Sequence, residues 1–101
     1  MEINVTIKRK TLVAALSGEL DHHTCKKIRE DTDRRAEAER PKLLRLDFSA
    51  VKFMDSSGIG LVMGRYRQMA LTGGRVEVVN IPSHLEKMFK ISGLASLGVI
   101  K

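Results

Sequence analysis

The chain has 101 residues, and 18 lysines and arginines against 12 aspartates and glutamates give it a net charge of +6. That length suits a single domain, and contents of 43% hydrophobic and 30% charged residues are typical of a folded globular chain, which argues against intrinsic disorder. No apolar run approaches the roughly 20 residues that cross a bilayer, and the N-terminus lacks a signal-peptide layout, so we expect a cytoplasmic protein with no membrane contact.

The chain opens with a predicted β-hairpin. Apolar and polar residues alternate over 3–7, which indicates a half-buried strand. A polar turn at 8–10 leads into a second apolar stretch over 11–16, which predicts the antiparallel partner. We expect the residues from 17 to 21 to break this second strand before a helix begins.

The first helix has clear signals at both ends. Either Asp21 or Thr24 is suited to cap its N-terminus, and Pro41 prevents it from continuing past about residue 40. The chain's single cysteine, Cys25, lies on the same helical stripe as Ile28. We expect a small core residue there rather than a reactive thiol, and a lone cysteine fits a reducing compartment.

The middle of the chain contains the clearest pattern. A compact apolar run over 43–48 predicts a central strand that is covered on both faces. Apolar residues then recur with helical spacing from 59 to 70, and Thr-Gly-Gly at 72–74 ends that helix.

The last third of the chain predicts a strand over 75–79, then a short helix that a Ser-His-Leu-Glu capping box over 83–86 would open. Residues 97–100 are suited to a final short strand. Alternating strands and helices imply a single α/β domain over 1–101, in which helices pack against a mostly parallel sheet of four to five strands after the N-terminal hairpin.

The run from Phe53 to Gly60 places two hydroxyls, Ser56 and Ser57, directly behind Asp55, where a strand passes into a helix. The first turn of a helix has unpaired N–H groups and the positive end of the helix dipole, so a phosphoryl group would be stabilised there. Because glycine has no side chain, Gly58 and Gly60 are expected to leave this helix start accessible to a second protein.

The helix after Ser56 has a polar stripe on the side away from its apolar face. This stripe contains Ser57, Leu61 and Arg65, and it continues through Gln68 and Thr72. Leu61 is either an ordinary exposed leucine or an apolar docking contact one turn beyond Ser57. Gly60 and Gly64 imply close approach by either the sheet or a partner, because glycine is otherwise costly in a helix.

Catalytic, metal and nucleic-acid sites lack support. Neither Ser56 nor Ser57 is flanked by the two glycines of a nucleophile elbow. The adjacent His22 and His23 would point about 100° apart on a helix and not converge on one ion. No Gly-Lys-Ser or Gly-Lys-Thr loop is present. An aromatic content of 4% is too low for base stacking, so the positive charge indicates a solvated surface or an acidic protein partner.

Several blocks of the sequence resemble one family. They are Gly18-Glu19-Leu20-Asp21-His22-His23-Thr24, the run from Phe53 to Gly60, Gly64-Arg65-Tyr66 and Ile91-Ser92-Gly93-Leu94. Together, in this order, they resemble the anti-sigma factor antagonists with the STAS fold, most closely those of sporulation. The blocks span nearly the whole chain.

The resemblance implies a regulator rather than an enzyme, with no cofactor of its own. The unphosphorylated form would bind an anti-sigma factor that is also a serine kinase with bound ATP or ADP, and so release a sigma factor. The kinase would phosphorylate Ser56, and a serine phosphatase would reverse this. Asp55 and the loop of Asp21, His22 and His23 would lie near the kinase nucleotide, with Ser57 and Gly58 completing the docking surface.

Two other functions stay open. One is a STAS regulatory module in a stress-response circuit. The other is a nucleotide-binding sensor that would use Asp21 and the helix start at Ser57 and Gly58 to hold phosphates. Members of the family continue into a further C-terminal helix, which we expect to be absent or trimmed here, since the chain stops at Lys101.

Overall fold

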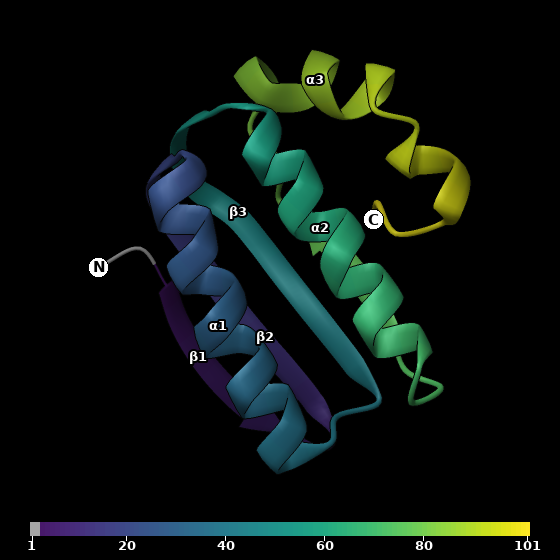
Figure 1. Cartoon of the computed structure of the whole chain (residues 1–101). Helices are drawn as coiled ribbons and strands as arrows, with labels where there is room; N and C mark the ends of the chain where they lie inside the picture. Colours follow the sequence, from purple (N-terminus) through teal and green to yellow (C-terminus); the bar gives the residue numbers. More distant parts are fainter. Residues whose placement is uncertain (1–2) are drawn as a thin grey trace.

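The computed structural model describes residues 3–101 and confirms the predicted α/β domain (Figure 1). Its strands and helices are β1 (Ile3–Lys8), β2 (Thr11–Leu20), α1 (His22–Glu39), β3 (Leu43–Met54), α2 (Ser56–Ala70), β4 (Arg75–Val79) and α3 (Glu86–Ile91). The four strands form one sheet in the order β1-β2-β3-β4. The β1–β2 hairpin is antiparallel and the other two pairings are parallel.

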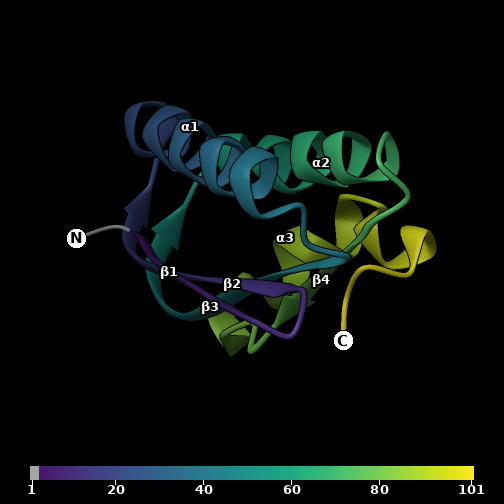
Figure 2. The same cartoon turned by 90° about the horizontal axis from the view of Figure 1, so that it is seen from below.

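Helices α1 and α2 lie side by side on one face of the sheet (Figure 2). Two successive crossovers that step in the same direction, from β2 to β3 and from β3 to β4, place their helices on the same side because such crossovers are right-handed. Alternate strand residues face these helices and form the core, among them the register pairs Leu12–Leu44 and Leu46–Val78.

The opposite face of β3 is half-buried and polar, so the expectation of apolar cover on both faces is wrong. Arg45 and Asp47 alternate with the core leucines. Arg45 forms an ion pair of 3.2 Å with Glu77, its register partner on β4. Because α1 and α2 cover only one face of this strand, polar side chains are favourable on its other face.

Strands β2 and β3 are both longer than predicted. The expected break at 17–21 is an irregularity inside β2, with shifts of register between Ala15 and Ser17 and between Gly18 and Glu19. Gly18 has φ of 77°, a conformation that glycine adopts without strain. The strand therefore bends and continues to Leu20, where it still pairs with β3.

The C-terminal segment curves past one end of α2 and along the β4 side of the molecule (Figure 1). The expected capping box is wrong: residues Ser83–Leu85 form a 3₁₀ turn, and Pro82 at its start provides no side-chain hydrogen bond. Phe89 of α3 packs edge-to-face on Phe48 of β3, with ring centroids 5.3 Å apart. This contact joins the C-terminal segment to the sheet.

The expected strand over 97–100 is reduced to a single bridge. Leu94–Leu97 form a second 3₁₀ turn, and Ile100 then pairs in parallel with Val78. Val78 N–H donates to the Val99 carbonyl, and Lys101 N–H donates to the Val78 carbonyl at 2.9 Å. Across residues 3–101, no helix has both the length and the hydropathy of a membrane span.

Candidate functional site

Two helix N-termini meet at one edge of the sheet. Strands β2 and β3 are parallel neighbours, and their last residues, Leu20 and Met54, are register partners. Each strand is followed at once by an aspartate, Asp21 or Asp55, and the Asp55 N–H donates to the Leu20 carbonyl at 3.2 Å. The carboxyl edge of a parallel sheet is where such folds usually place their sites.

Asp21 caps α1 through a reciprocal pair of hydrogen bonds with Thr24. The Thr24 N–H donates to Asp21 Oδ1 at 3.0 Å, and the Asp21 N–H donates to Thr24 Oγ1 at 2.9 Å. Both residues suggested by the sequence therefore take part in one capping box. The hydrogen bond from the Thr24 backbone lowers the pKa of Asp21, so its carboxylate is charged at neutral pH.

Asp55 caps α2 through a single hydrogen bond, without the reciprocal bond seen at Asp21. Its Oδ1 accepts a hydrogen bond of 2.8 Å from the Ser57 N–H. Ser56 is the first helical residue and is exposed, whereas Ser57 is half-buried on the side that faces α1. The geometry thus leaves Ser56 as the more accessible hydroxyl at this helix start.

Gly58 does not open the site to a partner as expected. It is buried against the end of β3, where an added Cβ would lie 2.2 Å from both Cγ and Sδ of Met54. Gly60 and Gly64 differ, because an added Cβ would have no atom within 4 Å at either position. Neither of the two is therefore required by close packing on the sheet.

This contrast predicts opposite effects of two alanine substitutions in one helix. Gly58→Ala should destabilise the fold by about 1–3 kcal/mol, since the buried Met54 must move. Gly64→Ala should stabilise it by about 0.5–1 kcal/mol, since alanine favours helix and meets no obstacle. Urea denaturation measures both, and equal effects in the two variants would contradict the packing role of Gly58.

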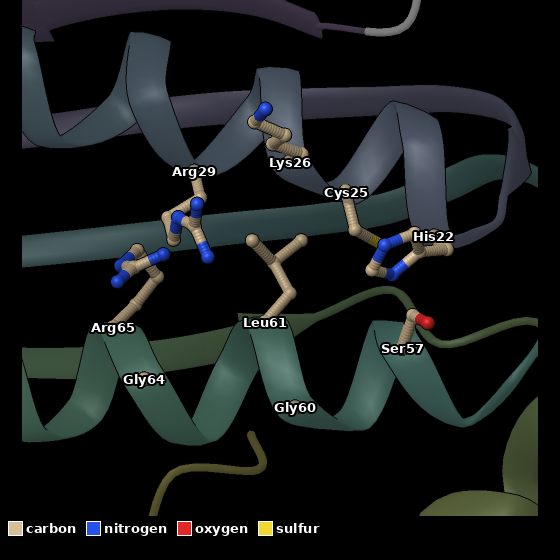
Figure 3. A pocket seen from close by; sticks show the side chains of 9 residues that line it. All are labelled: His22, Cys25, Lys26, Arg29, Ser57, Gly60, Leu61, Gly64 and Arg65. Carbon is tan, nitrogen blue, oxygen red and sulfur yellow. The ribbon is translucent and has the colours of Figure 1, made fainter.

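Leu61 and Arg65 are not on the exposed docking stripe that the sequence suggested. Both residues are only 5% exposed, because their side chains lie between α1 and α2 (Figure 3). Arg65 Nε lies 2.9 Å from Asp33 Oδ1 on α1. Helical spacing identifies this stripe correctly, but it does not reveal that a second helix covers it.

His22 and His23 are exposed in the first turn of α1. Their rings are 6.0 Å apart and inclined at 63°. Within the described part of the chain, no group of three or more histidine, cysteine or acidic side chains is arranged to hold a metal ion. Both imidazoles are exposed at the carboxyl edge of the sheet.

Cys25 is buried on α1 beneath this edge, as its helical stripe predicted. Burial raises the pKa of its thiol from 9.0 to about 11, and the charges of Asp55 and Asp21 add to the effect. At pH 8 the thiolate fraction falls about 100-fold, so alkylation by iodoacetamide should be at least that much slower than for an unfolded control. Alkylation at the rate of the unfolded chain would contradict this environment.

The sequence interpretation missed Phe53 as an exposed residue. Its side chain is 53% exposed, although the neighbouring Met54 is only 2% exposed. Phe53 pairs in register with Glu19, which is also exposed. The alternation of side chains along a strand could have revealed this. Because the Met54 side chain points into the core, the Phe53 side chain before it points outward.

Comparison with known sequences agrees with this geometry. Residues 2–100 match the family model described as STAS domain. The anti-sigma F factor antagonist of Paenibacillus polymyxa is 33% identical over 94 residues, which cover 93% of this chain and 80% of that protein. The anti-sigma-B factor antagonist of Bacillus subtilis is 29% identical over 99 residues, covering 96% of this chain and 89% of that protein.

Solved structures give the same result. The unphosphorylated form of the anti-sigma factor antagonist SpoIIAA superposes with a TM-score of 0.86 at 33% identity, covering 98% of this chain and 85% of that one. The phosphorylated form of SpoIIAA from Bacillus gives a TM-score of 0.78 at the same identity, covering 98% and 88%. Fold, motif blocks and sequence identity thus agree, and the chain belongs to the STAS-domain family of anti-sigma factor antagonists.

Proposed function

We propose that this protein binds an anti-sigma factor that is also a serine kinase, and that phosphorylation of Ser56 by this kinase ends the binding. The observation that carries the proposal is the exposed Ser56 at the start of α2, directly behind the cap formed by Asp55. The names of the similar antagonists support the partner class. The bound form displaces a sigma factor and so permits transcription.

The docking surface in this proposal consists of residues at the carboxyl edge of the sheet: Asp21, His22, His23, Phe53, Asp55, Ser56 and Ser57. Phe53 supplies an exposed aromatic ring, and aromatic side chains are enriched in protein interfaces. Asp21 and Asp55 lie where the kinase nucleotide would approach. Gly58 supports this surface from below through its packing on Met54, and Leu61 and Arg65 are left out because they are buried.

The helix start makes Ser56 a suitable place for a reversible charge. A phosphoryl group adds about −1.5 to −2 charges, and negative charge is favourable near the first turn of a helix. The modified protein therefore stays folded, and the change acts at the interface through bulk and repulsion. A serine phosphatase then restores the binding form.

The proposed circuit is that of sporulation. The stretch Asp21-His22-His23-Thr24 and the doubled serine support it, together with the similarity to antagonists of anti-sigma F. The stress-response circuit is the second candidate, favoured by the similarity to antagonists of anti-sigma-B. Partner identity, rather than fold, separates the two.

A displacement experiment tests the proposal. A preformed complex of anti-sigma F factor and its sigma factor, with ADP, is mixed with this protein and resolved by size-exclusion chromatography. We expect free sigma factor and a new complex that contains this protein. Displacement only from the anti-sigma-B complex would assign the stress-response circuit, and displacement from neither would contradict the proposed function.

A further inference from the structure

A hollow of about 400 Å³ lies between α1 and α2, beside the docking surface (Figure 3). His22, Cys25 and Arg29 line it from α1. Ser57, Leu61 and Arg65 line it from α2. The hollow thus extends from Ser57 at one end to two arginines at the other.

Arg65 is a buried cation with unused hydrogen-bonding capacity. Only 5% of the residue is exposed. The Asp33 carboxylate engages Nε at 2.9 Å, whereas the buried Nη1 has no hydrogen-bond partner within residues 3–101. Unmade hydrogen bonds on a buried charged group are costly, so a ligand that supplies acceptors to this guanidinium would bind favourably.

Arg29 places a second guanidinium opposite the first. Its side chain extends from α1 toward Arg65 (Figure 3). Burial lowers the pKa of Arg65; the Asp33 charge opposes that shift and the Arg29 charge adds to it. Asp33 is ion-paired with Arg65, and no acidic residue among 3–101 lines the hollow, so its lining carries an excess of positive charge at this end.

We propose that this hollow binds a phosphate group between Arg29 and Arg65. Guanidinium groups donate paired hydrogen bonds to phosphate oxygens, and a doubly charged anion would neutralise both arginines. Beyond the arginines, the wall is formed by Leu61 and by Gly60 and Gly64, where nothing lies within 4 Å of an added Cβ. The remaining space accommodates the organic part of a phosphomonoester, and the same arginines would accept inorganic phosphate.

The test is isothermal titration of the whole chain at constant ionic strength with two probes, inorganic phosphate and ribose 5-phosphate. Arg29→Gln removes one guanidinium from an exposed residue, and Gly64→Leu adds a side chain to the wall of the hollow while it keeps both arginines. Arg67→Gln is the charge-matched control, because Arg67 is exposed on α2, the helix of Arg65, and does not line the hollow. Circular dichroism confirms that each variant is folded.

We expect saturable binding of at least one probe, weakened tenfold or more by Arg29→Gln and by Gly64→Leu and unchanged by Arg67→Gln. The probe that binds more tightly distinguishes a phosphomonoester from free phosphate. Failure of both probes to saturate would overturn the site. Equal weakening by Arg29→Gln and Arg67→Gln would overturn it too, because net charge alone would then explain the binding.

Discussion

Ser56→Asp is expected to weaken binding to the anti-sigma factor by at least 100-fold, whereas Ser56→Ala should bind as tightly as the unmodified protein. A loss of about 3 kcal/mol in binding free energy corresponds to a change of more than 100-fold. Calorimetric titration of each variant into the anti-sigma factor with ADP measures the dissociation constants.

The expected loss has an electrostatic origin. Ser56 is exposed and directly follows Asp55, whose carboxylate already accepts the Ser57 N–H. A second carboxylate at this spot is compatible with the helix start, so the free energy of unfolding should change by less than about 0.5 kcal/mol. In the proposed complex, the added charge would instead be repelled by acidic groups of the partner.

Ser56→Asn is the matched control for this substitution, because asparagine has the size of aspartate without its charge. It should retain most of the affinity. Equal weakening by Ser56→Asn and Ser56→Asp would show that bulk alone ends the binding. Equal, tight binding by Ser56→Asp and Ser56→Ala, with unchanged folds, would refute the electrostatic account.

The second large effect is expected on the free energy of unfolding, from a substitution of Phe48 in β3, and Phe53 of the same strand provides the comparison. Phe48 is completely buried and packs edge-to-face on Phe89, whereas Phe53 is 53% exposed. Phe48→Ala should lower the free energy of unfolding by about 3–5 kcal/mol, because it leaves a cavity where the C-terminal segment meets the sheet. Urea denaturation followed by circular dichroism measures this loss.

Phe53→Ala makes the same chemical change on the same strand and should separate binding from stability. Its unfolding free energy should change by less than about 0.5 kcal/mol, while binding to the anti-sigma factor weakens by about tenfold or more. Unaltered affinity of the Phe53→Ala variant would remove this residue from the docking surface.

The topology could be predicted because the signals that determine it are local. Alternating apolar residues in 3–7, the apolar run at 43–48 and the helical spacing after Ser56 each indicate one element. The motif blocks then indicated the family. The cap of α1 was also predicted, by Asp21 and Thr24, whereas the cap that Asp55 forms on α2 was not.

The features that the sequence did not reveal, such as the burial of single side chains, depend on which helices and strands contact one another. Leu61 and Arg65 were expected on an open stripe, but α1 covers them. Gly58 was expected to give access, but Met54 occupies the space beside it. The irregularity at Gly18 also depends on such a contact. In the sequence, residues 17–21 have the composition of a strand end, but pairing with β3 continues β2 to Leu20.

The most direct test of the account is to incubate the protein with its cognate anti-sigma factor kinase and ATP and to map the modified residue by mass spectrometry. We expect one phosphoryl group on Ser56, none on the Ser56→Ala variant, and normal labelling at Ser56 in the Ser57→Ala variant. Phosphate on Ser57 or elsewhere in the chain, or no phosphate at all, would contradict the central claim.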